Sequence, residues 1–229
     1  MKKSLLVLAL ASAFAPVLAQ AEAGDIVVRL RAVSVSPNES SKLGKYVNDI
    51  NPAFMNRGGE LSVDNNVIPE IDFSYFITKN IAAELILALG TEHDVSIIKS
   101  TGAVQNQHLG KVDLLPPTLT LQWHFNPDQT FDPYVGAGVN YTYSLDRNLK
   151  FSQALPFSKI KISNDSWGLA AQAGLNVNLQ DGWSLNADVK YVQIDTTVKM
   201  KNTATGAWSK IDSLDINPWV FGVGIGKKF

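Results

Sequence analysis

The stretch WGLAAQAGLNVNL (residues 167–179) alternates strictly between two kinds of side chain. Its odd positions carry Trp, Leu, Ala and Val, whereas its even positions carry only Gly, Ala, Gln and Asn. Period-2 alternation is the pattern of a β-strand with two unlike faces. The alternation resumes in WSLNADVKY (residues 183–191), and an Asp-Gly pair lies between the two runs at residues 181–182. Such a pair between alternating runs is a strong hairpin signal, so the sequence predicts an antiparallel β-hairpin here.

The same pattern recurs over the rest of the chain and predicts an all-β fold. Eight strands are expected, at about 26–35, 67–78, 80–92, 112–125, 132–146, 166–180, 183–199 and 212–229. An even number of antiparallel strands can close on itself and leave no sheet edge.

The connections between these strands alternate in length. Short turns are expected at 79–80, 126–131 and 181–182, and long loops at 36–66, 93–111, 147–165 and 200–211. Short turns at one end and long loops at the other are typical of an outer-membrane barrel, with the turns periplasmic and the loops extracellular. We therefore predict an eight-stranded antiparallel transmembrane β-barrel.

The N-terminus reads as a targeting signal and not as part of the fold. Two lysines precede an apolar run at residues 5–15, and Ala19-Gln20-Ala21 offers cleavage after Ala19 or Ala21. This is the pattern of a secretory signal peptide. We expect residues 1–21 to be removed on export through the periplasm, and residues 22–229 to form a single barrel in the outer membrane.

The composition excludes several classes of function. With 20 basic and 21 acidic residues the formal net charge is −1, which gives no electrostatic case for nucleic acid as a partner. The absence of cysteine excludes a disulfide framework, a Cys-ligated zinc site, an iron–sulfur cluster and a thiol nucleophile. No cofactor and no metal site are expected.

Alternation alone does not say which face meets lipid, because a soluble β-sandwich also alternates. Many of the predicted strands exceed the roughly 9–11 residues that a tilted strand needs to cross a bilayer. The polar face is rich in Gly, Ala, Ser and Asn, which suits a narrow interior better than a solvated surface. Both features favour a barrel whose apolar side chains point outward.

The aromatic residues on the apolar face form two groups. One group lies near the short turns and the other near the long loops, as expected for the aromatic girdles at the two membrane interfaces. The first group is Trp123, Phe125, Trp183 and Phe229, and the second is Tyr141, Tyr143, Trp167 and Trp219.

Five stretches, in order along the chain, resemble the OmpW family of small outer-membrane β-barrels. They are LPPT (115–118), PYVGAGVNY (133–141), DSWG (165–168), IDTT (194–197) and NPWVF (217–221). The resemblance implies passage of small hydrophobic molecules across the outer membrane. The terminal Phe229 is similar to the aromatic residue that bacterial barrels present to their assembly machinery. The partners expected are thus outer-membrane lipid, small hydrophobic solutes and that machinery, with the protein itself a monomer.

The inward-facing positions are the first candidates for a functional site. The alternation places even positions inward after residue 67 and odd positions inward on the first strand. The inward charges are then Arg29, Arg31, Lys190 and Lys228 against Glu70, Asp72, Glu84 and Asp188. They could form a gated polar passage or a salt-bridged plug, since an unpaired charge in a confined interior would be unstable.

Three apolar residues, Ile86, Val192 and Val220, also point inward by this rule. They could line a pocket for a hydrophobic solute above the charged zone, or they could be simple interior packing. The lumen and gate candidates are therefore Glu84, Ile86, Asp188, Lys190, Val192 and Val220.

Pro116-Pro117 is a sharper signal, because proline lacks an N–H group and is normally excluded from central strands. Two adjacent prolines should cost the ladder at least one hydrogen bond, and the neighbouring strands could separate locally. We interpret this as a side opening through which an apolar molecule passes into the outer leaflet. The alternative is that both prolines lie above the bilayer, where water satisfies their partners.

Two other readings stay open: a structural or interaction barrel that transports nothing, and a narrow ion-conducting pore. Catalysis is not expected. The chain has three histidines, His93, His108 and His124, and no G-x-S-x-G nucleophile motif. In Glu92-His93-Asp94 neighbouring side chains alternate sides, so they do not share one face of a strand.

Overall fold

The structure is a computed structural model, and it describes most of the chain. The described residues are 22–89, 91–146, 148–149, 157–202 and 205–229. The predicted signal peptide, residues 1–21, lies outside them.

Eight antiparallel strands close into a barrel, as the sequence predicts. The barrel strands are β1 (Ile26–Ser36), β3 (Asn66–Phe76), β4 (Ile81–Ala88), β7 (Thr118–His124), β8 (Phe131–Asp146), β11 (Asp165–Asn178), β12 (Trp183–Val192) and β15 (Trp219–Lys228). Neighbours along the chain pair with each other, and β1 pairs with β15 to close the wall.

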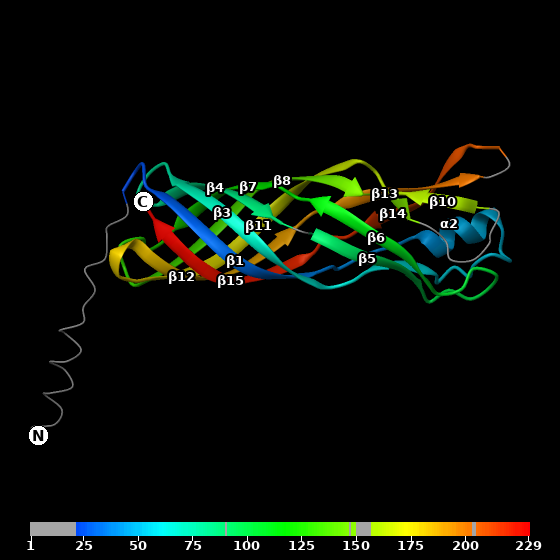
Figure 1. Ribbon diagram of the computed structural model, residues 1–229, viewed down its shortest axis with the longest axis horizontal. Helices are drawn as coiled ribbons and strands as arrows, with labels where there is room; N and C mark the ends of the chain where they lie inside the picture. Colours follow the sequence, from blue (N-terminus) through cyan, green and yellow to red (C-terminus); the bar gives the residue numbers. More distant parts are fainter. Residues whose placement is uncertain (1–21, 90, 147, 150–156, 203–204) are drawn as a thin grey trace, which may run out of the picture.

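Beyond the barrel, the segments between several barrel strands form an extracellular extension. Its elements are α2 (Leu43–Ile50), β2 (Glu60–Val63), β5 (Thr91–Ile98), β6 (Gln107–Leu115), β9 (Asn148–Leu149), β10 (Phe157–Lys161), β13 (Asp195–Asn202) and β14 (Trp208–Asp215). In Figure 1 the barrel occupies the left of the view, with the C-terminus at its end, and the extension with α2 lies on the right.

The extension corrects four predicted strand boundaries. The strands expected at 80–92, 112–125, 183–199 and 212–229 are each broken, and the expected loops contain further strands and a helix. At these breaks the chain leaves the barrel wall. Beyond it, β14, β13, β10 and β9 form a four-stranded sheet, in that order, on one side of the extension.

The Asp-Gly hairpin forms where the sequence places it. Asp181 and Gly182 both have positive φ, 55° and 74°, in the short 3₁₀ turn η1 (Gln180–Gly182) between β11 and β12. Gly182 adopts this backbone conformation without steric cost, and Asp is among the residues that tolerate it. The predicted two-residue turn is thus three residues long.

The outer face of the barrel is apolar. Leu169 and Val223, both on this face, leave 62% and 64% of their surface exposed. Soluble proteins rarely expose a continuous apolar band, whereas a membrane barrel must. Within the described residues, no helix is long and apolar enough to span a membrane.

The rule that even positions face inward holds in the barrel but is wrong on β5. There Thr91, His93, Val95 and Ile97 are the buried residues, so the inward parity changes between β4 and β5. The change lies at the break between the two strands, where the chain leaves the barrel wall. A shift of one residue turns every following side chain to the opposite face.

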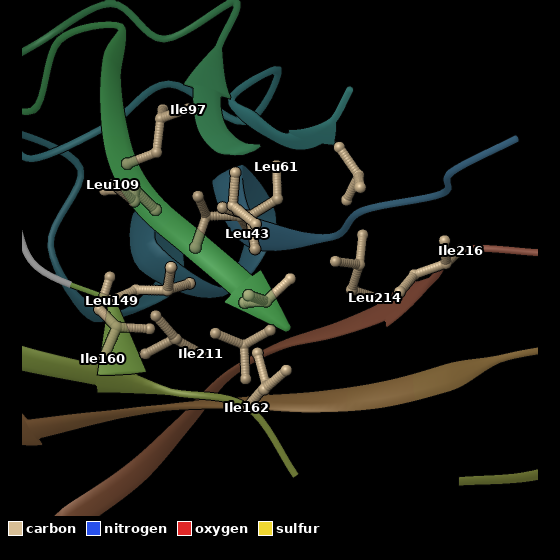
Figure 2. Close-up of a cluster of buried hydrophobic side chains, with 14 of the residues drawn as sticks. Leu43, Leu61, Ile97, Leu109, Leu149, Ile160, Ile162, Ile211, Leu214 and Ile216 are labelled. Carbon is tan, nitrogen blue, oxygen red and sulfur yellow. The ribbon is translucent and has the colours of Figure 1, made fainter. Parts of the chain in front are cut away.

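The interior of the extension is a hydrophobic core. Figure 2 shows Leu43 of α2, Leu61 of β2 and Ile160 of β10 converging on one interior, together with side chains from β5, β6 and β14. The long segments between barrel strands thus pack against one another over the mouth of the barrel.

Candidate functional site

The lumen of the barrel is filled by a network of charged side chains at mid-height. Arg31 of β1 is at its centre, and its guanidinium reaches four carboxylates on three other strands. The N–O distances are 2.5 Å to Asp72, 3.2 Å to Glu70 and to Glu84, and 3.3 Å to Asp188. Each of these side chains is almost completely buried. A planar guanidinium with five donors suits such a centre better than an ammonium group would.

Two further cations complete the network. Arg29 donates to Oε1 of Glu84 at 2.7 Å and to the Ser74 hydroxyl at 2.5 Å. Lys190 lies 2.7 Å from Glu70 and 3.0 Å from Asp188. The network therefore holds three cations and four carboxylates, which is what a salt-bridged plug requires.

Uncharged side chains complete the plug, and the sequence reasoning missed them. Gln122 and Gln172 donate to Oε2 of Glu84 at 2.6 and 3.1 Å. Tyr134 donates to Asp188 at 2.9 Å and accepts from Asn186. All four occupy even positions, so the alternation already placed them inward. They were missed because the candidates were drawn from the charged and apolar inward positions and not from the uncharged polar ones.

Glycines leave the space that these long side chains occupy. A Cβ at Gly174 would overlap the ring of Tyr134, and one at Gly224 would overlap the Leu30 carbonyl and lie 2.7 Å from Cγ of Arg31. The small residues on the inner face thus allow large polar side chains to cross a narrow lumen.

The lower lumen holds a second buried pair, which Gln122 links to Glu84 of the plug. Nδ1 of His124 lies 2.6 Å from Asp132, and its Nε2 lies 3.1 Å from the Gln122 amide oxygen. Lys228 corrects the predicted set of inward charges, because it pairs with Asp25 at 3.2 Å near the chain ends and not with the central network.

An apolar cavity lies directly above the plug, with about 700 Å³ of empty space including its open part. Its lining includes Ile86, Val192 and Val220, the three apolar candidates, and Lys190 and Glu70 form its floor. Two polar residues of β5, Thr91 and His93, also line it. They were missed because the inward parity changes before β5.

The wall beside this cavity is interrupted at Pro116-Pro117. The ladder between β4 and β7 ends at the pair Ile86–Thr118, and the ladder between β5 and β6 begins at Thr91–Leu114. Between these two pairs, no ladder pair joins residues 87–89 to residues 115–117, although Leu87 still pairs with Ile71 and Leu115 with Tyr143 on their other sides. The cavity lining includes residues from both sides of this gap.

The proline carbonyls at the gap are satisfied locally. The N–H of Tyr141 donates to the Pro117 carbonyl at 3.0 Å, and the Thr118 hydroxyl donates to that of Pro116 at 3.1 Å. The Asn140 amide lies 3.3 Å from both carbonyl oxygens. An unpaired backbone group is costly in lipid, so these contacts allow the wall to be open at this height.

The eight girdle candidates all lie on the outer surface, in two belts. Trp123, Phe125, Trp183 and Phe229 are about half exposed or more at the turn end, and Trp167, Trp219 and Tyr143 are exposed at the opposite end. The Tyr141 ring packs against Trp167, with centroids 4.7 Å apart. The cavity and the gap lie near the upper belt.

Comparison with known proteins places this architecture in one family. Residues 22–229 match the OmpW family. The chain is 38% identical to outer membrane protein W of Vibrio cholerae over 234 residues, with both chains fully covered. It superposes on the crystal structure of OprG from Pseudomonas aeruginosa with a TM-score of 0.75 and 30% identity, covering 91% of this chain and 97% of that one.

A more distant relative is the dibenzothiophene metabolism operon protein PahQ of Pseudomonas aeruginosa. It is 25% identical over 175 residues, which cover 75% of this chain and 76% of PahQ. With a family match over the whole described barrel and relatives that are outer-membrane proteins, the chain is an outer-membrane β-barrel and belongs to the OmpW family.

Proposed function

We propose that the protein lets small hydrophobic molecules cross the outer membrane, through the apolar cavity and out sideways at Pro116-Pro117. The observation that carries this proposal is the position of the cavity. The cavity has an apolar lining above a charged floor. Residues from both sides of the gap in the wall, such as Ala88 and Pro116, line it.

The charged floor supports a sideways exit over an axial one. Arg31 and its four carboxylates fill the lumen with side chains that leave at most 7% of their surface exposed. A hydrophobic molecule that moved down the axis would have to separate these ion pairs and displace them from one another. The same closed floor does not favour a narrow ion-conducting pore.

The extension offers an apolar approach to the cavity from outside. A second cavity, lined by Leu61, Val63 and Leu114, shares Val63 and Leu114 with the first one. A third cavity, below α2, shares Leu61 with the second. A hydrophobic molecule could therefore pass from the cavity below α2, through the second cavity, to the cavity beside the gap.

The likeness to PahQ also supports a hydrophobic substrate, because its name links that protein to dibenzothiophene, an apolar aromatic compound. We infer in addition that the protein is not an enzyme. Among the described residues, the buried His124 contacts Asp132 and Gln122, and neither of these side chains is a Ser, Thr or Cys nucleophile that the imidazole could activate.

The experiment is to close the gap by restoring the missing backbone donors. In the double variant Pro116→Val, Pro117→Thr the strands can pair through this region, and we expect the uptake of an apolar fluorescent probe into proteoliposomes to fall by at least fivefold. Heat-modifiable gel migration should stay that of the folded barrel.

The matched control is Pro133→Val, which changes a proline of β8 near the periplasmic turn, far from the gap. It should leave uptake within a factor of two of the wild-type rate. If the double variant is folded and takes up the probe at the wild-type rate, the sideways route is wrong. If the wild-type protein itself passes no apolar probe, the structural alternative holds instead.

A further inference from the structure

Five lysines lie together on the outer face of the extracellular sheet. They are Lys159 and Lys161 of β10, Lys199 and Lys201 of β13, and Lys210 of β14. In the ladder Lys159 is directly opposite Lys201, Lys161 opposite Lys199, and Lys199 opposite Lys210. We call this group the lysine patch.

The alternation of these strands turns every one of the five outward. The residues next to them in the chain, Ile160, Met200 and Ile211, are buried in the hydrophobic core of the extension. The position of each lysine on the outer face is therefore fixed by the burial of its neighbours.

No carboxylate neutralises the lysine patch among the residues that the structure describes. Lys161 lies over the ring of Trp208, 4.1 Å from its centroid, and Lys210 is 3.2 Å from the Ser213 hydroxyl. Two exposed lysines elsewhere on the extension are paired: Lys99 lies 2.8 Å from Glu60, and Lys111 contacts Glu92.

Like charges directly opposite each other on neighbouring strands are destabilising. Three such pairs on one small face give a concentrated positive field that a multivalent anion can neutralise. Phosphate groups are suitable partners, because lysine binds phosphate as a point charge and several lysines can share one polyanion.

The place of the lysine patch indicates which anion meets it. β13 continues the line of β12, on which Tyr191 packs against Trp219 in the upper aromatic belt, with centroids 5.1 Å apart. Lys199 is eight residues beyond Tyr191, so the patch stands roughly 20 Å above the belt, for a rise of about 3.3 Å per residue and a strand tilt of about 40°.

We propose that the lysine patch binds the phosphorylated core sugars of the lipopolysaccharide that surrounds the barrel in the outer leaflet. The acyl chains of this lipid contact the apolar wall below the belt. Its sugars rise beside the extension, where their phosphates reach the lysines. The site is separate from the cavity and the gap, and it does not depend on the proposed transport.

The test measures binding of lipopolysaccharide with an intact phosphorylated core to the full-length protein in lipid nanodiscs. The triple variant Lys161→Gln, Lys199→Gln, Lys201→Gln should bind at least tenfold more weakly, with a smaller dependence on salt. The control Lys99→Gln, Lys111→Gln removes two exposed extracellular lysines that have partners, and it should change affinity less than twofold.

The same titration with other lipids identifies the group that is bound. Enzymatically dephosphorylated lipopolysaccharide should bind the wild-type protein as weakly as the intact lipid binds the triple variant. Equal binding of the triple variant and the wild type would overturn the proposal. So would binding of lipid A without core sugars, or of phosphatidylglycerol, at the affinity of the intact lipid.

Folding is checked in parallel. The double variant Lys199→Gln, Lys201→Gln relieves the repulsion and keeps the contact of Lys161 with Trp208, so its unfolding temperature at low salt should rise and its heat-modifiable migration should be unchanged. An unfolding temperature below that of the wild type would contradict the unneutralised state of the lysine patch.

Discussion

At Arg31, one guanidinium lies within 3.3 Å of four carboxylates, and no other cation of the plug reaches as many. The plug has one carboxylate more than it has cations. Loss of a cation and loss of an anion should therefore have very different consequences, although both remove an ion-pair partner.

Replacing Arg31 by Gln should destabilise the barrel strongly. It leaves Glu70, Asp72, Glu84 and Asp188 with two cations in a confined interior, and breaking a buried pair in this way costs about 3–5 kcal/mol. The free energy of unfolding in urea, measured in detergent micelles, should fall by that amount. Water should also enter the lumen, so the conductance of single barrels in planar bilayers should rise.

The companion variant is Asp72→Asn, which removes the excess negative charge and keeps an oxygen for the Nε of Arg31. Its free energy of unfolding should fall by less than half as much as that of Arg31→Gln. Equal losses for the two variants would mean that the charge imbalance of the plug has no energetic effect.

At the scale of the elements, the barrel strands were predictable and the breaks between strands were mostly not. The alternation at 167–179 and 183–191 gave the hairpin, the inward face and the belts, because burial in the lumen and exposure to lipid act on alternate residues. The break at Pro116-Pro117 was also predictable, since proline cannot donate to the ladder.

The breaks at 193–194 and 216–218 carry a weaker signal. Buried residues stay on even positions through the first of them, with Val192 and Ile194 both inward, so the alternation gives no sign of a change. Asn217-Pro218 is a turn dipeptide that could have indicated the second. Asn217 has φ of 39°, and its side-chain oxygen accepts from the N–H of Ile194.

The plug could be predicted only in outline. The charged members followed from parity, but which pairs form depends on side-chain length and on the space that Gly174 and Gly224 leave. The cavity was further obscured by the change of parity before β5, which depends on the chain leaving the barrel wall and not on local sequence.

The break above β12 also brings two carboxylates together, since Asp195 of β13 is directly opposite Asp215 of β14. Burial and the Asp215 carboxylate raise the pKa of Asp195 above its ordinary value of 3.8. A raised pKa in the folded state gives stability that is fully present below pH 3.8 and is lost as the pH rises through the folded value.

The variant Asp195→Asn should therefore raise the unfolding temperature at neutral pH and leave it unchanged below pH 3.8. The measurement is thermal unfolding in detergent at the two pH values. Ser213→Ala, on the partner strand β14, is the control, because it removes no titratable group. A rise in unfolding temperature at acidic pH alone would show that the pKa of Asp195 is not raised in the folded state.

At the scale of the whole molecule, the proposed route requires that the two sides of the gap stay apart during transport. Leu87 and Leu115 lie on its two sides, at positions that face away from the lumen. The chain has no cysteine of its own, so a pair introduced here is the only target of a thiol reagent.

Joining Leu87→Cys to Leu115→Cys with reversible methanethiosulfonate linkers should stop uptake of an apolar probe, because the short linkers hold the wall closed. Reduction should restore uptake. The control pair Leu85→Cys, Leu119→Cys links residues that are already ladder partners, and it should have no effect. Uptake that persists across the linked gap would exclude this exit.

The arrangement of the plug also bears on how the barrel assembles. Arg31 is on the first strand, and two of its partners, Asp188 and Asn186, are on β12. β12 pairs with β15, so Arg31 meets these two partners only after β15 has joined β1. Until that seam forms, the carboxylates within reach of Arg31 are those on β3 and β4, Glu70, Asp72 and Glu84. Closure of the seam therefore brings Asp188 to Arg31 and Lys190 to Glu70, and these buried ion pairs across the seam make the cylinder hard to reopen once it has formed.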